Sequence, residues 1–198
     1  MLAAGRSQRS GRVHKSCRRV PGSRWTWLED QVRRLHWAGF APIRVIAGQR
    51  SRRLWRCCRL RVHRRVNFQA ARLGPFSSVR LAADTAATAV LLVQSDTQLP
   101  ANTELRRLRR ALHISSVMAA RLVDQHGHGG HPVLIAKVLA QQIRAAGEGE
   151  RLDKLLQSLP GAALANLPTR RFRSFPRLND AQGWNKARAQ LRVWARRS

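Results

Sequence analysis

The sequence has 198 residues, of which 43% are hydrophobic, so it is long enough to bury a core and is unlike a wholly disordered chain. Lysine and arginine number 38 against 10 acidic residues, and the formal net charge is +28. Only four of these cations are lysines. This charge predicts strong attraction to polyanions, and the length predicts a single domain over residues 1–198.

The cysteines and the apolar runs exclude several classes of protein. Cys17, Cys57 and Cys58 form an odd set without the spacing of a zinc site, so we expect no disulfide framework and a reducing, cytoplasmic location. The run nearest to a membrane span, 86–93, is too short. The first residues lack the charged and apolar regions of a signal peptide.

The chain opens with a stretch that predicts a phosphate-binding loop. Residues 2–15 read Leu-Ala-Ala-Gly-Arg-Ser-Gln-Arg-Ser-Gly-Arg-Val-His-Lys. Small side chains and glycines allow backbone N–H groups to approach a bulky anion. The arginines and Lys15 can neutralise that anion. The pattern is neither a Walker loop nor GxGxxG, so those two kinds of site are excluded.

The next elements predict alternation of helix and strand. Residues 25–37 predict a helix, because Leu28, Val32 and Leu35 recur at helical spacing and a glycine follows. Residues 42–48 are typical of a strand. A helix and a strand joined by a short glycine link indicate an α/β fold.

The run from Arg50 to Arg65 is the most basic part of the chain. Its arginines are interleaved with Trp55 and His63. One interpretation is the solvated face of a helix and a strand. The other is a strip that binds RNA or DNA, since arginine beside an aromatic ring suits contact with the backbone and stacking on bases.

A turn at Gly74 and Pro75 precedes a further helix. We expect Ser77 or Ser78 to cap that helix, which runs through Ala83. The free N–H groups at a helix start can bind an anion, and an ordinary helix cap is the alternative.

Residues 89–93 predict a buried parallel strand, because they form a continuous aliphatic run. Asp96 follows that strand, and ligands of open α/β sheets bind at the carboxyl ends of strands. Asp96 is therefore a candidate ligand for a hard cation such as Mg²⁺, with a capping or surface aspartate as the alternative. A helix that begins at residues 100–102 comes next.

The rest of the chain continues the alternation. We expect strands over 114–122 and 131–135 around a hairpin at 125–130, a helix over 136–146, a short helix at 152–156, a strand over 163–167 and a basic helix over 184–194. His126, His128 and His131 have neither the spacing nor the partners of a zinc site.

Four segments, taken in order, resemble one enzyme family. They are residues 2–15, 74–79 (Gly-Pro-Phe-Ser-Ser-Val), 91–96 (Leu-Leu-Val-Gln-Ser-Asp) and 130–134 (Gly-His-Pro-Val-Leu). The sequence is similar to the nucleotidyltransferases that include molybdenum cofactor cytidylyltransferase and guanylyltransferase. This resemblance implies an α/β fold, a single Rossmann-like three-layer αβα domain with a mostly parallel sheet. The family has a longer strand before the first loop, so the first strand is expected to be truncated here, and an apolar run upstream of Met1 would restore it.

The resemblance also implies roles for individual residues. Lys15, Arg9 and Asp96 would be catalytic, Lys15 and Arg9 on the triphosphate and Asp96 on Mg²⁺. Nucleotide-binding residues would be Leu2, Ala3, Ala4, Gly5, Arg6, Ser7, Gly11, Lys15, Ser77 and Ser78. Arg177 falls on the first position of the family's second metal motif and cannot bind Mg²⁺, so Asn179, or Asp180 by a small shift, would take its place.

The implied reaction transfers CMP or GMP from CTP or GTP to the phosphate of molybdopterin and releases pyrophosphate. The Gly-Pro-Phe-Ser-Ser form favours CTP. A molybdoenzyme or its chaperone is the implied protein partner. The alternative is a degenerate, weakly catalytic member of the fold that binds polyanions or RNA through Arg50 to Arg65.

Overall fold

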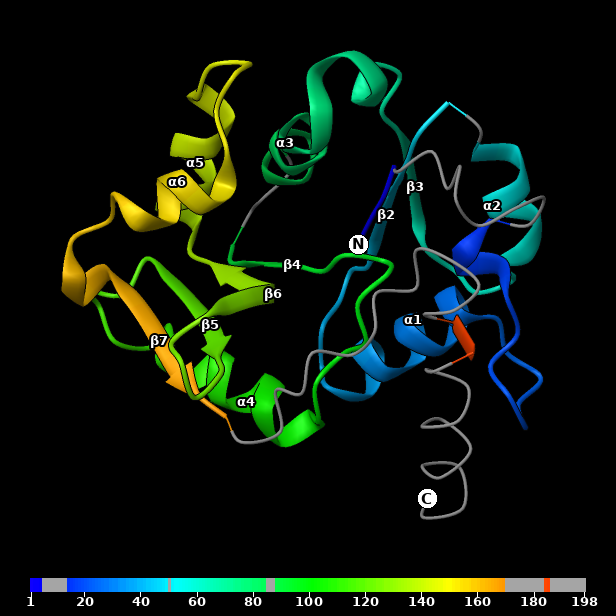
Figure 1. Ribbon diagram of the computed structural model, residues 1–198, viewed down its shortest axis with the longest axis horizontal. Helices are drawn as coiled ribbons and strands as arrows, with labels where there is room; N and C mark the ends of the chain where they lie inside the picture. The colour runs from blue at the N-terminus through cyan, green and yellow to red at the C-terminus, as the bar shows by residue number, and fades with distance from the viewer. Residues whose placement is uncertain (5–13, 50, 85–87, 170–183, 186–198) are drawn as a thin grey trace.

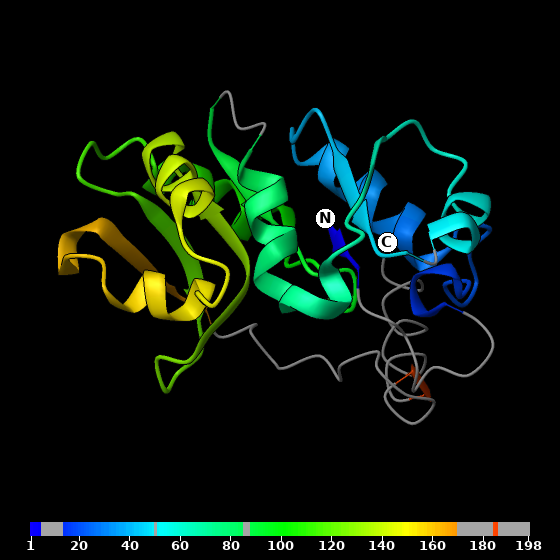
Figure 2. The same cartoon turned by 90° about the horizontal axis from the view of Figure 1, so that it is seen from above.

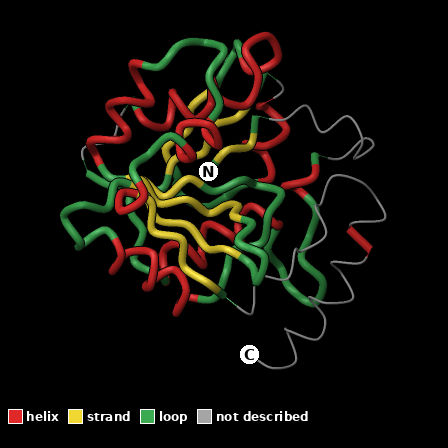
Figure 3. The backbone as a smooth tube through the Cα atoms, turned by 60° about the vertical axis from the view of Figure 1, so that its left-hand side comes forward, coloured by secondary structure: helices red, strands yellow, loops and turns green. Residues whose placement is uncertain are grey.

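The computed structural model describes residues 1–4, 14–49, 51–84, 88–169 and 184–185. Its strands lie side by side in one twisted layer (Figure 3). Their order across that layer is β3 (His63–Val66), β2 (Arg44–Ala47), β1 (Leu2–Ala3), β4 (Val90–Leu92), β6 (Gly129–Ile135), β5 (Ala119–Val123) and β7 (Leu164–Pro168).

The two-residue strand β1 joins the two halves of this layer. On one side, Leu2 pairs in parallel with Ile46 of β2. On the other side, the Leu2 N–H donates to the Val93 carbonyl at 2.7 Å, and the Ser95 N–H donates to the Leu2 carbonyl at 3.0 Å. The first strand is short, as predicted, and it still bonds to both neighbouring segments.

The strand directions confirm the predicted mostly parallel sheet. Strands β1, β2 and β3 pair in parallel, as do β5 and β7. Among the described strands, only β6 runs antiparallel to its neighbours, which are β4 and β5.

Helices cover both faces of the sheet and give three layers (Figures 1 and 2). One face packs against α3 (Ala70–Ala83), α5 (Lys137–Ala145) and α6 (Leu152–Gln157). The other packs against α1 (Trp27–Trp37), α2 (Ser51–Cys57) and α4 (Asn102–Ala111). Neighbouring strand residues point to opposite faces, so Val45 packs in the α1 cluster and Ile46 in the α3 cluster.

Helix α1 begins two residues later than the sequence pattern predicts, because Thr26 caps it. The Glu29 N–H donates to the Thr26 hydroxyl, and the Thr26 N–H donates to the Glu29 carboxylate at 2.9 Å, which is a capping box. The Glu29 carboxylate also accepts the Arg59 N–H at 2.9 Å. This buried carboxylate therefore ties the start of α1 to the chain after α2.

Helix α3 corrects the prediction that Ser77 or Ser78 is a helix cap. The helix begins at Ala70 and is kinked at Gly74, where φ is 72°. Ser77 and Ser78 lie after the kink, and both hydroxyls accept hydrogen bonds from the Asn67 amide at 2.9 Å. Glycine allows the left-handed backbone at the kink, and the two serines anchor the second half of the helix to Asn67.

The start of β5 also differs from the prediction, and the predicted C-terminal helix lies mostly outside the described residues. Strand β5 begins at Ala119 rather than 114, because the chain first makes a turn in which the Val117 N–H donates to the Ile114 carbonyl. Of the basic helix predicted over 184–194, residues 184 and 185 are helical and the others lie outside the described residues. No helix in the described ranges is long and apolar enough to cross a membrane.

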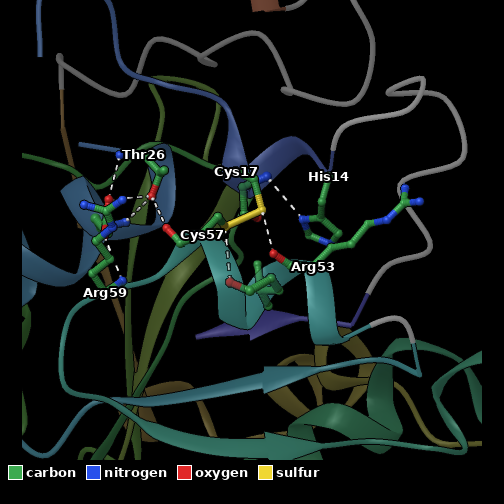
Figure 4. The surroundings of a disulfide bond; sticks show 9 residues. His14, Cys17, Thr26, Arg53, Cys57 and Arg59 are labelled. Carbon is green, nitrogen blue, oxygen red and sulfur yellow. Dashed lines mark hydrogen bonds between the residues drawn. A yellow bond between two sulfur atoms is a disulfide. The ribbon is translucent and has the colours of Figure 1, made fainter. Parts of the chain in front are cut away.

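The expectation that the cysteines form no disulfide is wrong. Cys17 and Cys57 are bonded, with their Cα atoms 5.4 Å apart (Figure 4). Cys58 is free and buried. Cysteine counting missed this bond because pairing depends on the folded distance between residues separated by 40 positions. In the chain-entropy model a crosslink of that span stabilises the fold by about 4 kcal/mol.

We predict that Glu29→Ala lowers the free energy of unfolding by about 2 kcal/mol, because it removes a helix cap and leaves the Arg59 N–H without its acceptor. Burial alone would raise the pKa of Glu29, but the hydrogen bonds from Thr26 and Arg59 outweigh burial and lower it. The stabilisation is therefore present above the ordinary pKa and is lost as the pH falls through the lower folded pKa. Urea unfolding at several pH values measures both effects.

The matched control is Glu150→Ala, since Glu150 is exposed. It should change the free energy of unfolding by no more than about 0.5 kcal/mol. Equal losses for the two variants would contradict the role given to Glu29.

Candidate functional site

An ion pair joins the two ends of the predicted site. The Lys15 ammonium donates to the Asp96 carboxylate, with Nζ and Oδ2 2.7 Å apart. The side chains are only 11% and 20% exposed, so each largely buried charge relies on the other for neutralisation. Residues 81 positions apart in sequence thus meet beside the carboxyl ends of β1 and β4.

Lys15 is placed by a short turn that begins at Lys15 itself. This turn, η2, is a 3-10 helix over Lys15–Cys17, and the His14 ring caps it by accepting the Ser16 N–H on Nδ1 at 3.3 Å. The disulfide from Cys17 then fixes the end of η2 to α2. Lys15 is therefore held by a cap on one side and a covalent bond on the other.

Asp96 is placed by polar side chains on the inner face of α1. The Trp27 indole N–H donates to the Ser95 carbonyl at 2.7 Å. One turn further on, Gln31 accepts the Leu99 N–H at 3.0 Å, and Arg34 donates to the Leu99 and Pro100 carbonyls at 3.0 and 3.1 Å. The segment after β4 is thus bonded to α1 on both sides of Asp96.

The roles of Trp27, Gln31 and Arg34 were not predicted from the sequence. Their spacing of four and three residues puts them on one helix face, and that pattern was visible in the sequence. The sequence did not indicate that the hydrogen-bond partners of these three side chains lie in residues 95–100. Gln31 is fully buried, and a buried amide inside a helix was the available signal that a polar partner faces it.

Gly48 allows the chain after β2 to lie against the start of the predicted phosphate loop. A Cβ at this position would stand 2.7 Å from the Ala4 carbonyl oxygen. Backbone cannot give way as a flexible side chain can, so any larger residue would displace Ala4.

Two buried oxygens from residues close in sequence to Lys15 and Asp96 lack hydrogen-bond partners in the described part of the chain. They are the Ser16 hydroxyl, next to Lys15, and the Gln98 amide oxygen, two residues after Asp96. Native structures leave few buried polar groups unsatisfied, and such groups mark places where a ligand, ion or water belongs.

His131 lies on β6 close to the ion pair. Its Nδ1 is 3.2 Å from the Leu92 carbonyl, which can only accept, so Nδ1 carries the hydrogen. Burial lowers the pKa of His131, and the hydrogen bond to the Leu92 carbonyl and the nearby Asp96 carboxylate only partly oppose that effect. The ring is therefore neutral at pH 7, with Nε2 unprotonated.

The remaining predicted residues divide into two groups. Leu2 and Ala3 form β1, Ala4 follows it, and Ser77 and Ser78 lie in α3 on the Asn67 amide. The others are outside the described residues: Gly5, Arg6, Ser7, Arg9, Gly11 and Asn179. Their assignments stay predictions.

The described part of the basic run, 51–65, forms α2, β3 and the link between them. Its arginines are exposed, and the Arg64 guanidinium lies 5.5 Å from the centre of the Trp55 ring. A solvated helix and strand face accounts for this placement. Binding of RNA or DNA by Arg50 to Arg65 stays a prediction.

The donors at the site fit a metal that arrives with a phosphate ligand. In the described residues, no group of three or more His, Cys, Asp or Glu side chains could hold a metal ion. Asp96 supplies a single carboxylate, and Mg²⁺ in nucleotide-binding enzymes takes one or two carboxylates together with phosphate oxygens.

Comparison with protein families gives a clear result. A sequence model described as the MobA-like NTP transferase domain matches residues 1–167. No curated protein has significant sequence similarity to this chain.

Solved structures share the fold at low sequence identity. A nucleotidyl transferase from Methanothermobacter superposes with a TM-score of 0.77 at 20% identity, covering 98% of this chain and 96% of the other. Rv0371c from Mycobacterium tuberculosis gives 0.74 at 20%, covering 96% and 95%, and it has also been solved as a complex with manganese. Molybdopterin-guanine dinucleotide biosynthesis protein A from Archaeoglobus fulgidus gives 0.68 at 14%, covering 97% of each chain.

We predict that His14 titrates at a pH of about 4 in the folded protein. Burial is the larger cause of this lowered pKa, and the neighbouring Lys15 charge is the smaller one. Because the unfolded chain takes up this proton at a higher pH than the folded one, stability should fall as the pH drops from 6.5 toward 4. NMR titration of the imidazole signals, assigned by their loss in His14→Gln, measures the midpoint, and a value near 6.5 would contradict the buried cap.

Proposed function

Because the chain belongs to the MobA-like NTP transferase domain family, we propose that it transfers a nucleoside monophosphate from an NTP to a phosphate-bearing acceptor and releases pyrophosphate. The observation that supports this most directly is the contact between Lys15 and Asp96. It brings a cation from the predicted phosphate loop to a carboxylate at the carboxyl end of β4, where open α/β sheets bind their ligands.

In this proposal Lys15 binds the triphosphate and stabilises the charge that develops in the transition state. Arg9, from the same predicted loop, is proposed to neutralise the outer phosphates. The acceptor phosphate is itself the nucleophile, so the protein needs no general base and contributes positioning and charge. The bonds from α1 to residues 95–100 would supply that positioning for Asp96.

Asp96 would also hold a divalent cation, for which we propose Mg²⁺. The cation would neutralise charge on the α-phosphate. In this proposal the ion pair opens when the substrate binds. The Lys15 ammonium then contacts a phosphate, and the Asp96 carboxylate contacts the metal. Asn179 remains the proposed second ligand.

The finer assignments rest on sequence resemblance. We propose CTP over GTP from the Gly-Pro-Phe-Ser-Ser segment at residues 74–78, which would lie near the nucleotide through Ser77 and Ser78. Molybdopterin phosphate is the proposed acceptor, and a molybdoenzyme or its chaperone the proposed partner. A cytoplasmic location is also proposed, and there the Cys17–Cys57 bond would be exposed to reducing thiols.

We predict that Lys15→Ala and Asp96→Ala each lower turnover by about two to three orders of magnitude in a pyrophosphate-release assay. Each change also leaves a largely buried charge without its partner, so circular dichroism must first show that the variants fold. The double variant should lose less stability than the two single losses added together, because all three variants remove the same contact.

Matched controls are Lys137→Ala and Asp84→Ala, since both residues are exposed and lie on other elements. Their turnover should equal that of the unaltered protein. Unchanged turnover in folded Lys15→Ala or Asp96→Ala would refute the assigned roles.

We further predict that CTP with Mg²⁺ raises the melting temperature more than GTP with Mg²⁺. A nucleotide at about 100 times its dissociation constant should stabilise the fold by about 2.7 kcal/mol. A larger shift with GTP would reverse the base assignment. No shift with any nucleotide, together with salt-sensitive binding of RNA, would favour the polyanion-binding alternative.

A further inference from the structure

A hollow with a volume of about 600 Å³ lies beside the disulfide, on the side of Cys57. It is bounded by Trp25 and Thr26 at the start of α1 and by residues at the end of α2. Four arginines line it: Arg19, Arg24, Arg56 and Arg59. All four are exposed, so their guanidinium groups are accessible to a ligand from solvent.

The hollow is strongly positive. Glu29 is the acidic residue in its lining, and that carboxylate already accepts hydrogen bonds from Thr26 and Arg59. The guanidinium groups of Arg24 and Arg33 each lie 4.6 Å from the centre of the Trp25 ring, which adds to the positive charge beside the hollow. Such a surface suits a small organic anion, since arginine forks bind carboxylate and sulfonate groups.

Each sulfur of the disulfide beside this hollow has a backbone carbonyl oxygen nearby. The Cys17 sulfur lies 3.5 Å from the Arg53 carbonyl oxygen, and the Cys57 sulfur lies 3.2 Å from the Leu54 carbonyl oxygen (Figure 4). In the dithiol form each S–H would therefore have an acceptor. Cys58 does not compete, because it is buried and burial raises the pKa of its thiol.

We propose that Cys17–Cys57 is a site of reversible thiol–disulfide exchange with a small anionic thiol that binds in the arginine-lined hollow. Of the two cysteines, Cys57 belongs to the lining of the hollow, so the proposal places the attack on its sulfur.

The exchange proceeds in two balanced steps. The thiolate of the small molecule attacks the Cys57 sulfur, a new S–S bond forms, and Cys17 leaves as a thiolate that takes a proton from water. A second small thiolate then attacks the small-molecule sulfur of the mixed disulfide and releases the Cys57 thiolate. Two small thiols are oxidised to their disulfide, and the protein is reduced to the dithiol.

Opening the bond has a structural consequence for the site described above. The disulfide ties η2, which begins at Lys15, to α2. Reduction therefore removes the covalent tie between η2 and α2, while the His14 cap and the ion pair to Asp96 stay. An effect of reduction on nucleotide binding rests on the proposed function, whereas the exchange itself does not.

The test measures how fast three thiols of similar size open the bond in the oxidised full-length protein. The probes are 2-mercaptoethanesulfonate, 2-mercaptoethanol and 2-aminoethanethiol, which are anionic, neutral and cationic, and rates are compared per thiolate at low salt. We expect the anionic thiol to react about ten times faster than the neutral one, and the cationic thiol to be slowest. Added salt should reduce this difference.

Arginine variants distinguish the effect of the hollow on the reaction rate from the effect of the chain's general positive charge. Arg56→Gln and Arg19→Gln should each lower the preference for the anionic thiol several-fold. Arg106→Gln removes the same charge from an exposed position on α4 and should leave the preference unchanged. Equal rates for all three thiols, or equal effects of the three substitutions, would overturn the proposal.

Mass mapping of the acid-quenched intermediate gives a second, independent result. The small thiol should be found on Cys57, and its presence on Cys17 would overturn the assigned direction of attack. Pyrophosphate release is then compared between the oxidised and reduced proteins. Absence of release in both states would refute the proposed function and leave the exchange result standing.

Discussion

The ion pair between Lys15 and Asp96 is the contact on which the candidate site depends. Two largely buried charges are tolerated only when they neutralise each other. These two can meet because β1 and β4 are adjacent and parallel, so that the segments following both strands leave the sheet at the same edge. The shortness of β1 does not prevent this, since Leu2 bonds to the chain on both sides.

Helix α1 connects the packing of the fold to the geometry of the site. Its apolar face, which includes Leu28 and Val32, packs in the core beneath the sheet. Its polar side chains, Trp27, Gln31 and Arg34, hold the backbone on both sides of Asp96. The capping box at Thr26 fixes where the helix begins and thereby sets the position of all three. Helix α1 thus both covers one face of the sheet and orients the Asp96 carboxylate.

Local pattern in the sequence was sufficient for most elements. Leu28, Val32 and Leu35 predicted α1, the aliphatic run at 89–93 predicted β4, and the four motif segments predicted the family and the mostly parallel sheet. The predictions were wrong where a residue's role depends on a partner that is distant in the sequence. Ser77 and Ser78 bond to Asn67 instead of capping a helix, and Cys17 pairs across 40 residues. The bonds from α1 to residues 95–100 span more than sixty positions and leave no local pattern.

The aromatic contact between Trp27 and Trp184 shows that the folded domain includes a residue beyond the family match. The family match stops at residue 167, but Trp184 is buried edge-on against Trp27, with ring centres 6.1 Å apart. Trp27 is the residue whose indole holds the Ser95 carbonyl. A fragment cut at the family boundary would keep nearly the whole sheet and expose this indole to water. Trp184 therefore covers the side chain that anchors Asp96, and it belongs in any fragment of the protein that is made for activity measurements.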